Sequence, residues 1–162
     1  MTTTPMNANT DTDTATDTDT GSTTVTGHFT YASWDETCAT DAGTSPRISH
    51  ASVVNTFTGG IEAVDTRCEY ICTYVTETTG CFNGMEFFSG RLGGREGRFV
   101  VEERGHFGAD GTVHCAFEVV PGSGTDALAG LTGKGRFVAP HGEKSVPYTF
   151  TYTLPDLPDL PA

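Results

Sequence analysis

Residues 119–137 read VVPGSGTDALAGLTGKGRF, and the interpretation of this stretch decides the fold. Its five glycines lie between apolar segments, as they would in a phosphate-binding loop or in the corner of a sheet. A phosphate loop needs a glycine five residues before the Gly-Lys pair, a Ser or Thr after the lysine, and a helix beyond. Leu128 stands in the place of that glycine, Gly135 follows Lys134, and no helical pattern comes next. We therefore predict a tight corner of a β-structure, in which glycine permits positive φ angles.

The segments around this corner alternate apolar and polar residues with a period of two, which is typical of strands. The clearest case is residues 68–78, where one face carries Cys68, Tyr70, Cys72 and Tyr74 and the other carries Glu69, Ile71, Thr73 and Val75. Comparable segments lie at 24–34, 47–59, 80–90, 94–105, 112–120, 134–139 and 146–154. The pattern predicts an all-β fold, either a sandwich or a single antiparallel β-barrel of about eight strands. Closure removes exposed strand edges, so we favour the barrel, with Leu128 and Leu131 tucked under one end as a plug.

The composition divides the chain into three regions. Residues 1–23 form a Thr/Asp-rich stretch without aromatic side chains, which is expected to be a disordered tail. Residues 24–154 hold the predicted strands and are expected to form the barrel domain. Residues 155–162 repeat Leu-Pro-Asp and are expected to be a short Pro-rich tail, because proline blocks both helix and central strand.

The charge of the chain excludes some partners. The formal net charge is −12, and acidic residues still outnumber the nine basic ones within the predicted barrel. An acidic surface repels nucleic acid and anionic lipid, so neither is an expected partner. No apolar run is long enough for a membrane span, and the first residues lack the basic end and apolar core of a secretory signal. The expected location is the cytoplasm.

The cysteines are expected to be reduced thiols. They number five, at Cys38, Cys68, Cys72, Cys81 and Cys115, and an odd number without an export signal argues against a disulfide framework. Cys68 and Cys72 would lie about 13 Å apart on one strand face, too far for one bridge or one metal ion. We predict no metal and no cofactor.

Four stretches of the chain resemble the signature of a bacterial family called Domain of Unknown Function 3224. They are GHFTYASWDE at 27–36, ASVVNTFTGGIEA at 51–63, MEFFSGRLGGREGRFVVEERGHF at 85–107 and the glycine-rich stretch at 119–137. Their order and spacing extend the resemblance over about residues 25–154. It implies a β-barrel similar to that of allene oxide cyclase, with an internal cavity and no settled activity. Three cysteines within residues 64–84 depart from the apolar residues expected there, which indicates a cavity particular to this chain.

Two glutamates within apolar strands are the candidate catalytic residues. Glu86 shares a face with Phe82 and Phe88, and Glu69 shares one with Ile71 and Val75. If those faces point inward, each carboxyl is costly to bury unless it is paired or protonated, and a raised pKa suits it to acid–base work near neutral pH. The alternative is that each meets an arginine, such as Arg67 or Arg98, or faces water.

Aromatic side chains are the candidate ligand-binding residues, namely Trp34, Tyr70, Phe88 and Phe117. Trp34 is expected to end the first strand, where it would cap the barrel or stack on a ligand at the mouth. The run Glu102, Glu103 and Arg104 resembles an exposed charged stretch of little energetic weight. His106 and His114 flank a predicted hairpin turn and could approach each other, but a metal site built from them and a glutamate is the minor alternative.

These observations leave two principal functional hypotheses. The barrel binds a small hydrophobic molecule without converting it, as its many strand aromatics indicate. Alternatively, it is a cofactor-free cyclase or isomerase that folds a hydrophobic metabolite into a reactive shape while one glutamate moves a proton. A structural or assembly protein remains a third interpretation, and a homo-oligomer is expected.

Overall fold

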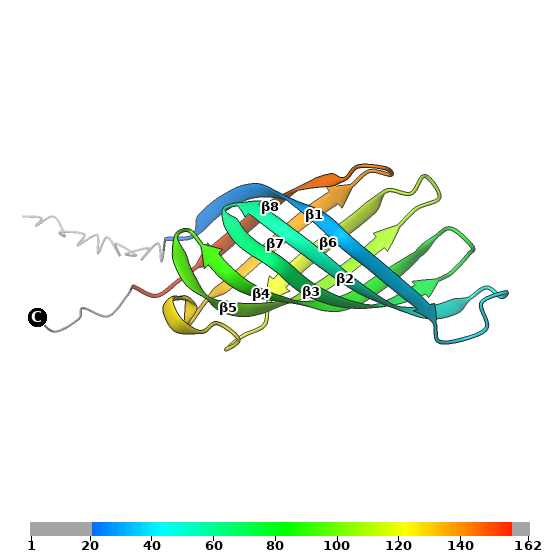
Figure 1. Cartoon of the computed structure of the whole chain (residues 1–162), viewed down its shortest axis with the longest axis horizontal. Coiled ribbons are helices and arrows are strands. Elements are labelled where there is room, and N and C mark those ends of the chain that lie inside the picture. The colour runs from blue at the N-terminus through cyan, green and yellow to red at the C-terminus, as the bar shows by residue number, and fades with distance from the viewer. Residues whose placement is uncertain (1–20, 157–162) are drawn as a thin grey trace, which may run out of the picture.

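The computed structural model describes residues 21–156, which fold into one closed antiparallel barrel of eight strands (Figure 1). The strands are β1 (Thr23–Cys38), β2 (Arg47–Gly59), β3 (Ile61–Tyr74), β4 (Gly80–Leu92), β5 (Arg95–Phe107), β6 (Val113–Val119), β7 (Thr132–Ala139) and β8 (Ser145–Thr153). Each strand pairs with the next, and β8 returns to pair with β1. The predicted all-β barrel is therefore confirmed. Of the two predicted tails, residues 1–20 and 157–162 lie outside the described residues.

The two ends of the barrel differ in how they are covered. The hairpins between β1 and β2, β3 and β4, β5 and β6, and β7 and β8 lie at one end, which we call the open end (Figure 1). At the other end, the closed end, the short 3₁₀ turn η1 (Asp126–Leu128) lies across the barrel between β6 and β7. Among residues 21–156, no helix is long and apolar enough to cross a membrane.

The glycine-rich segment that opened the sequence analysis is the corner that closes this end. Its Thr125 amide donates to the Arg98 carbonyl at 2.9 Å, and the Arg98 amide donates back to Thr125 Oγ1 at 3.0 Å. These bonds hold the corner against β5. Leu128 and Leu131 are almost completely buried there among the closed-end aromatic residues, so the predicted plug is confirmed.

Two irregularities in the strand pairing change which side chains point inward. The pairing of β1 with β2 shifts between Tyr31 and Ser33, so Trp34 returns to the inner face although it lies three residues after Tyr31. A similar shift in β3 between Ala63 and Arg67, with Asp65 at a φ of 55°, turns Thr66 inward. Such bulges re-aim the side chains that follow them. The prediction that Trp34 ends the first strand was wrong, because the bulge lets β1 continue to Cys38.

We expect the Leu128→Ala variant to lose about 2–5 kcal/mol in free energy of unfolding, the usual cost of a large-to-small change in a packed core. Leu128 has no exposed surface, so its removal leaves a cavity beneath the corner. Urea unfolding of the variant and the wild type measures the difference. Val64→Ala is the matched control, because Val64 is 70% exposed, and it should change stability by less than about 0.5 kcal/mol. Equal effects of the two substitutions would contradict the role given to the plug.

Candidate functional site

The open half of the barrel contains a cavity of about 840 Å³. The hairpins after β5 and β7 form much of its rim, with Asp110, His141 and Glu143 among the rim residues. Aromatic side chains from the strands form a large part of its wall, including Tyr31, Trp34, Tyr70, Tyr74, Phe82 and Phe137. The cavity therefore opens at the end away from η1 and is walled by apolar surface.

The four predicted ligand-binding aromatics separate into two groups. Trp34 and Tyr70 line the cavity, and their rings stack with centroids 6.2 Å apart. Phe88 and Phe117 also point inward, but they lie deeper, in the closed-end core, where Phe88 stacks on Phe99 at 4.7 Å. Their distance along the barrel from the mouth makes these two residues part of the packing beneath the cavity.

The position of Trp34 at the mouth is set by a carboxylate. Trp34 Nε1 donates to Glu36 at 3.1 Å, and Glu36 also accepts hydrogen bonds from Tyr74 at 2.6 Å and Ser49 at 2.9 Å. Partial burial alone would raise the pKa of Glu36, but these hydrogen bonds and the charge of Arg47 outweigh it and lower the pKa. The ionised carboxylate therefore holds the indole, half of which remains exposed, over Tyr70.

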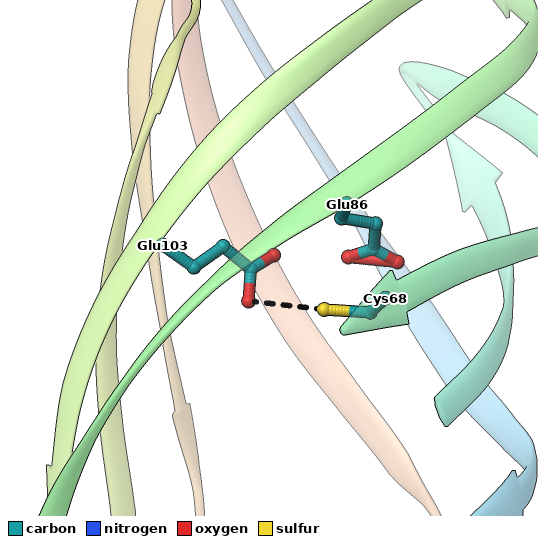
Figure 2. Close-up of side chains that lie close together, drawn as sticks. All are labelled: Cys68, Glu86 and Glu103. Atoms are coloured by element: carbon teal, nitrogen blue, oxygen red, sulfur yellow. Dashed lines mark hydrogen bonds between the residues drawn. The ribbon is translucent and has the colours of Figure 1, made fainter. Parts of the chain in front are cut away.

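Two glutamates are buried inside the barrel beside this cavity. Glu86 on β4 is 1% exposed and Glu103 on β5 is 2% exposed. They are diagonal neighbours, since Glu86 pairs with Val101 and Glu103 pairs with Gly84. Figure 2 shows the two carboxyl groups close together inside the barrel. Among the described residues, no ion pair involves either carboxyl, so neutral donors must satisfy both.

Glu86 is held by Asn55 and Thr66. Its Oε2 accepts hydrogen bonds from Asn55 Nδ2 at 2.9 Å and from Thr66 Oγ1 at 2.6 Å. Thr66 reaches it because the bulge at Asp65 turns this side chain inward. Of the orientations left open for Glu86, the structure has the inward one. Arg67 and Arg98, the arginines weighed as its alternative partners, lie outside the core.

Glu103 is held by a tyrosine and two thiols. Its Oε2 accepts a hydrogen bond from the Tyr70 hydroxyl and weaker ones from Cys115 Sγ at 3.8 Å and Cys68 Sγ at 3.9 Å, the latter drawn in Figure 2. Burial, and then the charge of Glu86, raise the pKa of Glu103 well above its ordinary value. Burial also raises the pKa of both thiols. Burial therefore favours the neutral forms of these groups, and Tyr70 is the member of the group that also lines the cavity.

The burial of Glu103 corrects the sequence-based interpretation of residues 102–104 as an exposed charged run. Glu102 and Arg104 are exposed, but the strand alternation places Glu103 on the inner face with Phe99 and Val101. The period of two in FVVEE contained this signal, because Phe99, Val101 and Glu103 are spaced by two residues. Three consecutive charged residues obscured it.

Glu69 lies on the outer wall, which agrees with the alternative that it faces water. Ser52 Oγ donates to its Oε2 at 2.6 Å, and His50 Nε2 lies 2.8 Å from the same atom. The alternation of β3 forces this arrangement, since Cys68 and Tyr70 on either side point inward. Glu69 is therefore separated from the cavity by the sheet, and its placement gives no support to a catalytic role.

Side chains of the types that can ligate a metal ion come together at one place among the described residues. Cys68, Glu86 and Glu103 offer ligand atoms that all lie within 4.8 Å of one another. The hydrogen bonds given above already satisfy these groups, so we assign them to a hydrogen-bonded network. His106 and His114 do lie side by side, with ring centroids 4.9 Å apart, but both are exposed on the outer wall. All five cysteines are free thiols, as predicted.

The fold and site define a class of protein: a closed eight-stranded antiparallel barrel with one cavity-bearing end and a buried carboxyl pair beside the cavity. Residues 25–152 match the model of the family described as "Protein of unknown function (DUF3224)", and the chain belongs to this family. The chain is also similar to a solved structure, a protein of unknown function from the DUF3224 family of Shewanella oneidensis MR-1. The two share 26% identity over 84% of this chain and 100% of that one, with a TM-score of 0.64. No curated protein matches the chain.

We expect Gly84→Ala to destabilise the barrel by about 1–3 kcal/mol, as overpacking of a core does. Gly84 lies between Tyr70 and Glu103 in the strand pairing, and a β-carbon there would come within 2.4 Å of both the Glu69 carbonyl and the Tyr70 ring. Urea unfolding measures the loss. Gly43→Ala is the control, since the only atom near its added carbon is a side-chain oxygen 3.7 Å away. No difference between the two variants would show that the Tyr70 ring does not need this space.

We expect Glu103→Gln to lose less stability than the wild type as the pH rises. Burial and Glu86 raise the folded-state pKa of Glu103 above the ordinary value of 4.5. Its protonated form therefore stabilises the folded state fully below the unfolded pKa, and this contribution is lost as the pH rises toward the folded pKa. Glutamine cannot ionise, so this loss is absent from the variant. Its free energy of unfolding, relative to that of the wild type, should therefore rise by about 1.4 kcal/mol for each pH unit.

Urea unfolding at several values from about pH 5 to about pH 8 measures this shift. Glu102→Gln, at an exposed neighbouring position, is the control and should follow the wild-type curve. Parallel curves for Glu103→Gln and the wild type would mean that Glu103 is already ionised in the folded protein.

Proposed function

We propose that this protein binds a small apolar or aromatic molecule in the cavity at the open end of the barrel. The observation that carries the proposal is a volume of about 840 Å³ walled by aromatic side chains, with few polar groups at its inner end. Ligand pockets are typically of this size, largely apolar and fitted with a small number of placed polar groups. The polar groups here are Asn55 and the Tyr70 hydroxyl, each bonded to a buried carboxyl.

The fixed mouth supports binding. Trp34 is tied to Glu36 and stacked on Tyr70, so a planar molecule that enters the cavity meets aromatic surface already in place. A preorganised surface favours affinity because fewer side chains lose rotational freedom when the ligand binds.

We expect the neutral dye Nile red to increase its fluorescence on binding and an Ala139→Phe variant to abolish the increase. Ala139 lines the cavity, and a phenyl ring at this position would fill part of it. Ala116→Phe is the matched control, because Ala116 is exposed on the outer wall. Both variants should keep the wild-type far-ultraviolet circular dichroism. Equal fluorescence for the two variants would place the dye elsewhere and remove the support for a binding cavity.

A second candidate is a cofactor-free isomerase, favoured by Tyr70 in the cavity wall and by the buried Glu103 that its hydroxyl contacts. The reaction would be a shift of a proton within an unsaturated ketone. A base removes the proton between the carbonyl and the double bond, and a proton returns at the far alkene carbon, so no oxidant is needed. A protonated Glu103 would donate to the Tyr70 oxygen, which frees the single Tyr70 hydroxyl proton for a hydrogen bond to the carbonyl oxygen as that oxygen gains negative charge. Glu86 is kept as the proton acceptor proposed from the sequence, and the likeness to allene oxide cyclase stays a prediction.

Conversion of a β,γ-unsaturated cyclohexenone to its conjugated isomer, followed by ultraviolet absorbance, tests this candidate. Tyr70→Phe and Glu86→Gln should each reduce the rate by about 10²-fold, the usual scale for an oxyanion donor or a general base. Glu69→Gln, on the outer wall, should leave it unchanged. No rate above background in the wild type would remove the isomerase and leave the binding function intact.

The cellular location and the assembly state are further proposals. Five free thiols suit a reducing compartment, and we keep the cytoplasm as the proposed location. Homo-oligomer formation and a purely structural role stay predictions, and light scattering after size exclusion measures the first.

A further inference from the structure

The charge around the cavity is negative. Asp110 and Glu143 line it, and neither lysine nor arginine is among its lining residues. The Thr112 amide donates to Asp110 Oδ1 at 2.9 Å, and this hydrogen bonding lowers the pKa of Asp110, so this side chain is ionised at neutral pH. Arg47 lies against the Tyr74 ring at 4.0 Å from its centroid but does not line the cavity. A cleft lined by one sign of charge concentrates ligands of the opposite sign.

The aromatic wall has the same preference. Trp34, Tyr31 and Tyr74 stand near the mouth, and Tyr70 and Phe82 continue the wall inward. The faces of aromatic rings attract cations, most strongly where water is excluded. An organic cation could therefore lie against this wall while its apolar part is buried.

At the inner end of the cavity, one hydrogen-bond acceptor receives no hydrogen bond. Asn55 is 4% exposed and lines the cavity, and its Oδ1 is the one buried side-chain polar atom of the described residues without a hydrogen-bond partner. The orientation of the amide is set by Glu86, because a carboxyl oxygen that already accepts from Thr66 takes Nδ2 as its second donor. The amide oxygen is thus left as an acceptor, and an unsatisfied buried acceptor is costly. A ligand with an N–H group at its inner end would satisfy it.

From these three observations we propose that the ligand is an amine: an apolar, aromatic-sized body with a protonated amino group that enters first and donates to Asn55 Oδ1. Asp110 and Glu143 attract the cation to the mouth, the aromatic wall accommodates it, and the unpartnered amide oxygen and the nearby Glu86 carboxyl receive it. The proposal rests on the binding function proposed above and specifies the class of ligand. Carboxylate-bearing molecules such as fatty acids are excluded by the same charges.

Four probes with one skeleton test the proposal by isothermal titration calorimetry, with quenching of the single tryptophan, Trp34, as a second readout. They are para-butylbenzylamine, its trimethylammonium analogue, para-butyltoluene and para-butylbenzoate. We expect the amine to bind about tenfold or more tightly than the neutral toluene, since a charged hydrogen bond contributes on this scale. The trimethylammonium probe has the charge but no N–H donor and should fall between them. The benzoate should bind most weakly.

Glu143→Gln tests the charge at the mouth. This variant should bind the amine about two- to fivefold more weakly, which is the scale of one exposed charge, and its affinity for the toluene should be unchanged. Glu62→Gln removes the same charge from the exposed start of β3 at the closed end, and it is the control. If the toluene binds as tightly as the amine, or the benzoate binds more tightly, the amine proposal is overturned while the binding function stands. If neither Nile red nor any of the four probes binds, both are overturned.

Discussion

The pairing of β8 with β1 is the interaction on which the rest of this structure depends. It leaves no free edge, so each strand must present one face to the interior and the other to solvent. Every side chain is then assigned to one face by the period of two, except where a bulge shifts the count. The bulges after Tyr31 and Ala63 are such places, and they turn Trp34 and Thr66 inward. The candidate site is thus a product of closure and of two local departures from regular alternation.

Two acids inside a barrel without a buried cation require an explanation, and hydrogen bonding supplies it. Glu86 is satisfied by an amide and a hydroxyl, and Glu103 by a phenol and two thiols. A buried carboxyl without such donors would cost several kcal/mol, on the scale of other unsatisfied polar groups. Gly84 lies between Tyr70 and Glu103 in the strand pairing. Because it has no side chain, the Tyr70 ring can lie over it on the inner face and reach Glu103. Of the three cysteines within residues 64–84, Cys68 takes part in this network.

The fold could be predicted from the sequence because it depends on local, repetitive information. Period-two segments and the glycine-rich corner indicated the barrel, and both were confirmed. The site was accessible only in part. Glu86 was found because it is a single charge among apolar residues and Tyr70 because it is aromatic, whereas Glu103 was concealed between Glu102 and Arg104. The orientation of Glu69 stayed open because its strand carries apolar residues on both faces. The role of Asn55 depends on Thr66 from β3 and Glu86 from β4. The spacing of residues along β2 does not show which residues of other strands will lie beside it.

The corner formed by residues 120–131 has a consequence for how the family can diversify. Because it seals one end, the packing around Leu128 and Leu131 lies at one end of the tube and the hairpins that rim the cavity lie at the other. Hairpins at the other end can change length and sequence without disturbing the packed half, since loops tolerate such changes far better than cores. A relative could therefore reshape the rim of the cavity by altering these hairpins alone. In the barrel described here, the packing of the closed end and the shape of the cavity mouth can therefore change independently of each other.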